Sequence, residues 1–92
     1  MIKFDVSSLR VMAGRAFPLG AAVRETGVRF ALVSRHATRV WLALFENIEA
    51  RKPFVEFEID PREHRVGDIW SIFVEGLPGG VLYMYRVEGP FD

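Results

Sequence analysis

The sequence predicts an all-β fold, an antiparallel β-sandwich formed by a single domain over residues 1–92. Side chains alternate with a period of two residues in five segments, which is typical of strands that bury one face. Residues that favour turns separate these segments at the spacing expected of a sandwich. No segment shows the 3.6-residue period of an amphipathic helix.

The first part of the chain contains two of the five predicted strands. They span residues 28–33 and 40–45, with a short polar turn between them. Before them, residues 1–16 can add one edge strand, but Gly14 and Pro18 limit its length because neither residue favours the interior of a strand.

The second part of the chain contains the other three predicted strands, which span residues 54–59, 69–74 and 82–87. Residues 60–68 form the loop between the first two of these strands. The turn at 76–80 is rich in glycine. Glycine adopts the positive φ that a tight turn requires, so we expect this turn to close a hairpin.

Apolar side chains in phase with one another are expected to share one core between two sheets, because their strands all present one apolar face. These residues are Val28, Phe30, Leu32, Val40, Leu42, Leu44, Val55, Phe57, Ile59, Trp70, Ile72 and Val74.

The strand at 40–45 differs from the others because both of its faces are apolar. Trp41, Ala43 and Phe45 occupy the face opposite to the predicted core. A two-layer sandwich covers only one face of each sheet, whereas a strand that is apolar on both faces is normally covered on both. Either loops and long side chains cover this second face, or another domain docks on Trp41 and Phe45.

Composition excludes several classes of function. Twelve basic residues balance twelve acidic ones, so the chain lacks the charge expected for binding nucleic acid or an anionic membrane. The chain has no cysteine, which excludes disulfides and thiolate zinc sites and favours a reducing compartment, here the cytoplasm. No apolar run approaches the length of a membrane span, and residues 1–9 lack the features of a signal peptide.

The polar residues do not form a recognisable catalytic constellation. His36 and His64 lie in different predicted loops, without the spacing of a metal site. Three acids, Asp60, Glu63 and Asp68, cluster in one loop with arginines among them, as expected of a solvated turn. We therefore predict no catalytic residue, no metal and no cofactor.

Aromatic residues are the remaining candidates for a functional site. Exposed rings can stack on the flat C–H faces of sugars, while polar neighbours bind the hydroxyl groups. Trp41, Tyr85 and Phe91 are the candidates for carbohydrate binding. The alternative is that they belong to the core, as most aromatic side chains in strands do.

Six segments of the chain occur in the order and spacing of one known family: 17–21 (FPLGA), 27–34 (GVRFALVS), 36–45 (HATRVWLALF), 67–70 (GDIW), 76–80 (GLPGG) and 83–92 (YMYRVEGPFD). The chain thus resembles the N-terminal β-sandwich domain of isoamylases and bacterial glycogen debranching enzymes, which belongs with the family 48 carbohydrate-binding modules.

The resemblance implies an immunoglobulin-like sandwich that precedes a catalytic (β/α)8 barrel of the α-amylase superfamily. That barrel hydrolyses α-1,6 branches with two carboxylates, neither of which can be assigned to this chain. The segment 82–92 ends abruptly after a strand, so we expect the polypeptide to continue toward the barrel. The predicted partner is this C-terminal catalytic barrel of the same polypeptide.

The chain departs from related modules that bind glycogen on their own. Those modules carry a tryptophan in the loop after the second strand, but residues 46–52 contain no aromatic residue. Their second tryptophan corresponds to Phe91, so we expect at most weak binding of α-glucan.

Three interpretations therefore stay open: a non-catalytic accessory domain of a debranching enzyme, an autonomous α-glucan-binding module, and a sandwich that binds other proteins. If the domain evolved against a barrel, the Trp41 face should be exposed in the isolated chain, which should then self-associate through it.

Overall fold

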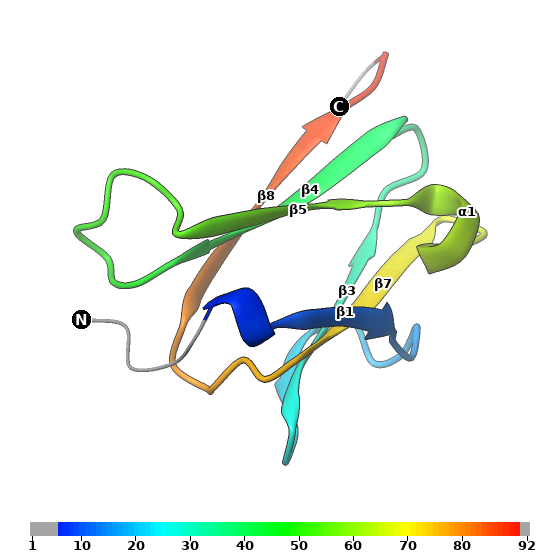
Figure 1. Ribbon diagram of the computed structural model, residues 1–92. Coiled ribbons are helices and arrows are strands. Elements are labelled where there is room, and N and C mark those ends of the chain that lie inside the picture. The colour runs from blue at the N-terminus through cyan, green and yellow to red at the C-terminus, as the bar shows by residue number, and fades with distance from the viewer. Residues whose placement is uncertain (1–5, 91–92) are drawn as a thin grey trace.

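The computed structural model describes residues 6–90, which form a sandwich of two antiparallel sheets (Figure 1). One sheet has the strand order β1-β7-β3-β2, with the short strand β6 also paired to β7, and the other has the order β5-β4-β8. The strands are β1 (Arg10–Ala13), β2 (Gly20–Val23), β3 (Gly27–Val33), β4 (Arg39–Phe45), β5 (Val55–Ile59), β6 (Arg65–Val66), β7 (Ile69–Glu75) and β8 (Leu82–Glu88). The two short helical segments are η1 (Val6–Ser8), a 3-10 turn, and α1 (Pro61–His64).

The predicted fold class is confirmed, and all five predicted strands form as β3, β4, β5, β7 and β8. The prediction of a hairpin closed by the turn at 76–80 is wrong, because this turn joins β7 of one sheet to β8 of the other. The edge strand expected within residues 1–16 is β1, which pairs with β7. Two strands were missed. β2 consists mainly of small residues that do not alternate, and β6 is only two residues long, so neither carries a detectable period-two pattern.

The prediction of a simple loop at residues 60–68 is wrong, because α1 and β6 form there. The carboxylate of Asp60 accepts a hydrogen bond from the backbone N–H of Arg62 at 2.9 Å, and Pro61 occupies the first turn of α1. Both are favourable positions for these residues at a helix start. One helical turn is too short to show a 3.6-residue period.

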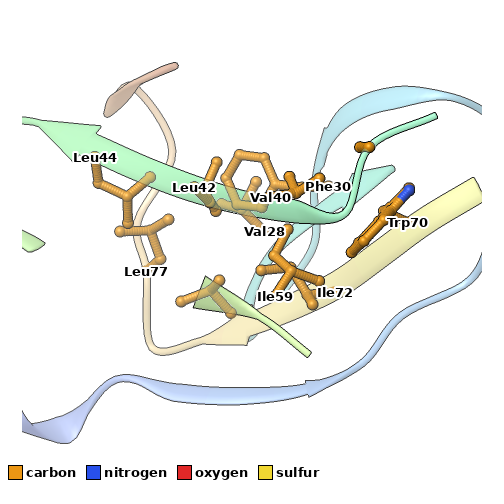
Figure 2. Close-up of a cluster of buried hydrophobic side chains, with 11 residues drawn as sticks. Val28, Phe30, Val40, Leu42, Leu44, Ile59, Trp70, Ile72 and Leu77 are labelled. Atoms are coloured by element: carbon orange, nitrogen blue, oxygen red, sulfur yellow. The ribbon is translucent and has the colours of Figure 1, made fainter. Parts of the chain in front are cut away.

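The core lies between the two sheets, where side chains of β4 meet those of β3 and β7 (Figure 2). Most of the predicted core residues are buried there, whereas Leu32, Val55 and Phe57 are partly buried and pack against its margin. The core also contains Ala37 and Leu77 from the connections. The indole N–H of Trp70 donates to the Ser34 carbonyl oxygen at 3.1 Å, which satisfies the polar atom of the largest core side chain.

The segment at 14–19 crosses the outer side of the larger sheet. It connects β1, at one edge beside β7, to β2, which pairs with β3 at the other edge. The Ser71 hydroxyl donates to the carbonyl oxygen of Gly14 at 3.2 Å, and Arg29 Nη1 donates to that of Arg15 at 3.1 Å. A Cβ at Gly14 would lie 2.7 Å from the backbone of Ile72, so glycine permits the close crossing.

Candidate functional site

The candidate functional site is the outer face of the sheet β5-β4-β8. Strand alternation places Trp41, Ala43 and Phe45 on this face, opposite the core side chains of β4. The register sets Trp41 between Glu58 of β5 and Arg86 of β8. The face therefore has a charged end around Trp41 and an apolar end around Phe45.

Trp41 is buried although it lies on the outer face, with 7% of its surface exposed. The guanidinium carbon of Arg86 lies 4.0 Å from the centroid of the indole, and that of Arg39 lies 4.6 Å away. Both arrangements are cation–π contacts. The expectation of an exposed Trp41 is wrong, and the alternative in which long side chains cover this face is confirmed for Trp41.

Carboxylates of β5 hold the two guanidinium groups over the indole. Arg39 donates from Nε and Nη2 to the two carboxylate oxygens of Glu58 at 3.0 and 2.9 Å. Arg86 Nη2 donates to Glu56 Oε1 at 2.8 Å. The hydrogen bonds from Arg39 lower the pKa of Glu58, and the same contact raises the pKa of Arg39. Because Glu88 lies 4.0 Å from Arg39 Nη1, Arg39 is an ion-pair partner of two acids.

The apolar end of the outer face is open to solvent. Phe45 is half-buried, whereas Leu82, Met84 and Ile48 are 41%, 62% and 87% exposed. These four side chains line one shallow depression, and Phe45 and Met84 also line a second one beside Pro53. We call Phe45, Ile48, Leu82 and Met84 the apolar patch. Contiguous exposed apolar residues of this kind mark interaction surfaces in soluble proteins.

Tyr85 does not lie with Trp41 on the outer face. It pairs in register with Leu42 and packs against the core, with its ring edge-on to Tyr83 at 5.7 Å. Its hydroxyl is buried and has no hydrogen-bond partner among residues 6–90. Burial raises the pKa of Tyr85 to about 12, helped by Tyr83 and opposed by the positive charge of Arg29. Phe91, the remaining carbohydrate candidate, lies outside the described residues.

The polar loop residues do not converge on a catalytic centre in the part of the chain that the structure describes. Asp60 caps α1, and Glu63 lies 3.7 Å from Nε2 of His64. Within residues 6–90, no three His, Asp or Glu side chains gather closely enough to bind a metal ion. The same residues include no helix that is long and apolar enough to span a membrane.

The two arginines that cover Trp41 were not among the residues predicted for the site. Arg39 could have been found, because it precedes Trp41 by two residues and must share its face of the strand. Arg86 could not have been found in this way, because its contact depends on the register between β4 and β8. The sequence signal for Arg86 is only that it alternates with apolar residues in its own strand.

The fold and the outer face together define a small β-sandwich with an exposed apolar patch on one face. Residues 18–92 match the family model of carbohydrate-binding module 48, the isoamylase N-terminal domain. The chain therefore belongs to this family, which confirms the resemblance found in the sequence.

Curated relatives agree with this assignment. The chain is 48% identical over 84 residues to isoamylase 3, chloroplastic, of Oryza sativa subsp. japonica, covering 85% of this chain and 11% of that protein. It is 39% identical over 85 residues to isoamylase SU1, chloroplastic, of Zea mays, covering 89% and 11%. It is 38% identical over 82 residues to the glycogen debranching enzyme of Dickeya chrysanthemi, again covering 89% and 11%. The chain spans about a tenth of the length of these relatives.

Proposed function

We propose that this chain is a non-catalytic accessory domain of a debranching-type glycoside hydrolase. In this proposal a (β/α)8 barrel of the same polypeptide hydrolyses α-1,6-glucosidic bonds of glycogen or starch. The observation that carries the proposal is the match of residues 18–92 to the isoamylase N-terminal domain. The names of the relatives, isoamylases and glycogen debranching enzymes, support the choice of reaction.

The docking surface in this proposal is the outer face of β5-β4-β8, and its apolar patch makes the main contact. Phe45 is the half-buried member of the patch, and Met84 is its most exposed member on β8. The guanidinium groups of Arg39 and Arg86 cover the ring of Trp41. In this proposal Trp41 therefore packs beneath the contact surface and does not itself insert into the partner. Burial of Leu82 and Met84 removes apolar area from water, which favours association. The same patch is where we expect the isolated domain to self-associate.

A chimera tests the proposal in a complete enzyme. Residues 18–92 replace the matching segment of the Dickeya chrysanthemi glycogen debranching enzyme, and the release of reducing ends from amylopectin is measured. We expect the chimera to be active. Introducing Met84→Asp into the chimera should reduce its activity or its thermal stability, whereas Val66→Asp should have little effect on either. Val66 is the matched control because it is 74% exposed on β6, in the other sheet.

Two results would contradict different parts of the proposal. Equal behaviour of the Met84→Asp and Val66→Asp chimeras would refute docking through the apolar patch. An inactive chimera, made from a segment that folds normally by itself, would refute the accessory role in this class of enzyme.

Autonomous binding of α-glucan is the second candidate function, because the family's own description is a carbohydrate-binding module. Two guanidinium groups lie over the ring of Trp41, and the ring of Tyr85 packs against the core. Phe91 is then the main candidate platform, which supports weak rather than strong binding.

The proposed location follows from the type of parent enzyme. For a bacterial parent we propose the cytoplasm, which the lack of cysteine supports because disulfides mark oxidising compartments. The plant relatives are described as chloroplastic, and that location is theirs. Fractionation of cells followed by detection of the parent polypeptide tests the proposal.

A further inference from the structure

β8 forms an open edge of the smaller sheet. It pairs with β4 over all seven of its residues, Leu82–Glu88, and has no strand on its other side among residues 6–90. The carbonyl oxygen of Glu88 accepts a hydrogen bond from the N–H of Thr38 at 2.7 Å, so it faces the β4 side. Backbone groups of successive residues alternate between the two edges of a strand, so those of Val87 and Tyr85 face the open edge. There they can hydrogen-bond to a further strand.

The other edge strands are less suited to the addition of a strand. β1 and β2 have four residues each, and β6 has two. β5 has five residues, and its exposed side chains include Glu56 and Glu58. Two copies of β5 side by side would bring these acids together, and like charges across an edge oppose pairing. β8 is longer, contains no proline or glycine, and exposes Leu82, Tyr83 and Met84.

The charges of β8 are complementary to those of a second, antiparallel β8. Arg86 and Glu88 lie two residues apart on the outer face, with 55% and 54% of their side chains exposed. A two-fold axis at Val87 would place Arg86 of each copy opposite Glu88 of the other. An axis at Arg86 would oppose two arginines, and an axis at Glu88 would oppose two glutamates. An axis at Tyr85 would set Arg86 opposite Met84, so charge complementarity selects the pairing centred on Val87.

This pairing would extend the ion pairs that already cover the outer face. Arg86 donates to Glu56 at 2.8 Å, and Glu88 lies 4.0 Å from Arg39. Across the two-fold axis, Arg86 would gain a second acid and Glu88 a second arginine. Charges of opposite sign would then alternate from one copy to the other. On the inner face Val87, which packs against the margin of the core, would meet its own copy and remove apolar area from water.

We propose that a second copy of this chain adds to the open edge of β8, antiparallel and centred on Val87. The two smaller sheets then form one continuous sheet with the strand order β5-β4-β8-β8-β4-β5. The apolar patch lies on the outer face of this sheet and takes no part in the edge contact, so the dimer is separate from self-association through the patch. The proposal does not rest on the proposed function, because it involves only two copies of a described strand.

Exchange of the two charges tests the pairing in the complete 92-residue chain by sedimentation equilibrium at increasing concentration. Arg86→Glu leaves two acids at the edge and Glu88→Arg leaves two arginines, so each variant repels its own copies. An equimolar mixture of the two variants restores two pairs of opposite charge. Arg51→Glu and Glu49→Arg, alone and mixed, are the matched controls, because they make the same charge changes at exposed loop positions. Ile48→Asp alters the apolar patch away from β8.

Circular dichroism checks that each variant is folded. If Arg86→Glu does not fold, the neutral Arg86→Gln takes its place. Its mixture with Glu88→Arg still restores one pair of opposite charge, between Glu88 of one copy and Arg86 of the other.

We expect the unaltered chain, the loop variants and Ile48→Asp to form dimers. Each edge variant alone should associate about tenfold more weakly or not at all, and their mixture should regain the dimer. A mixture that associates no more tightly than its two components overturns the proposal, and so does an unaltered chain that stays monomeric at about 1 mM. Loss of the dimer in Ile48→Asp but not in the edge variants would assign the contact to the apolar patch and also overturn it.

Discussion

Trp41 illustrates how neighbouring side chains decide the role of a surface residue. Its position on the outer face made it a candidate for docking or for stacking on a sugar, but the guanidinium groups of Arg39 and Arg86 lie over its ring. Glu58 and Glu56 fix these arginines in turn. At the scale of the residue, a large aromatic is therefore shielded without any loop or partner domain.

Removal of one guanidinium should expose the indole of Trp41. We expect Arg86→Ala to increase quenching of tryptophan fluorescence by acrylamide and to shift the emission to longer wavelength, because water then reaches the ring. The other tryptophan, Trp70, is 1% exposed and contributes little to quenching. Arg51→Ala, at an exposed loop position, is the control. Unchanged quenching in Arg86→Ala would show that Arg39 alone shields the ring.

Core packing at the residue scale makes a quantitative prediction for Leu42. This side chain is fully buried in the centre of β4, so Leu42→Ala should reduce the free energy of unfolding by about 2–5 kcal/mol. Urea denaturation followed by circular dichroism measures this change. Ile48→Ala, at an 87% exposed position, should stay within about 0.5 kcal/mol of the original chain. A loss of under 1 kcal/mol for Leu42→Ala is incompatible with this core.

At the scale of the element, α1 shows how one polar side chain starts a helical turn inside a β-protein. The backbone N–H of Arg62 donates to the Asp60 carboxylate, and the side chain of Arg62 adds a second, longer contact. Both hydrogen bonds lower the pKa of Asp60 below its ordinary value of 3.8. This turn lies in the connection between β5 of one sheet and β6 of the other, so Asp60 stabilises the start of the link between the two sheets.

The pH dependence of stability should reveal this cap. Because the pKa of Asp60 is lower in the folded state, its stabilising effect is present above the unfolded pKa and is lost as the pH falls through the folded pKa. We expect Asp60→Ala to lower the unfolding midpoint at pH 7. Asp60→Asn should retain most of the stabilisation at pH 7, since asparagine also caps helices. Thermal unfolding between pH 7 and pH 2 measures both variants. A parallel acid loss in Asp60→Asn and in the original chain would exclude this role of the carboxylate.

At the scale of the whole molecule, the two sheets present different outer surfaces. The crossing segment 14–19 covers part of the larger sheet and exposes Phe17 and Leu19, whereas the smaller sheet carries the apolar patch on its strands. This arrangement leaves little surface for strong recognition of a glucan, since the flat ring of Trp41 is covered.

Binding of α-glucan by the isolated chain should accordingly be weak. One ring that stacks on one glucose contributes about 1–2 kcal/mol, judged from aromatic pairs, while association costs several kcal/mol of lost freedom. We expect a Kd for maltoheptaose no tighter than about 1 mM, equivalent to about 4 kcal/mol. Phe91→Ala should weaken any binding, and His64→Ala should leave it unchanged. Titration calorimetry measures the affinity, and a low-micromolar Kd would favour the autonomous glucan-binding module instead.

The sequence by itself determined the strands whose two faces differ, and the core side chains of β4 and β7, because strand alternation is a local property of the chain. It also placed Phe45 on the outer face of β4. Tertiary structure decided the strand order, the small strands β2 and β6, and the shielding of Trp41 by Arg86. These features depend on register between segments far apart in the chain: Trp41 and Arg86 meet only because β4 and β8 pair with one particular alignment. A shift of one residue would move Arg86 to the core side of β8, and no local pattern fixes that choice.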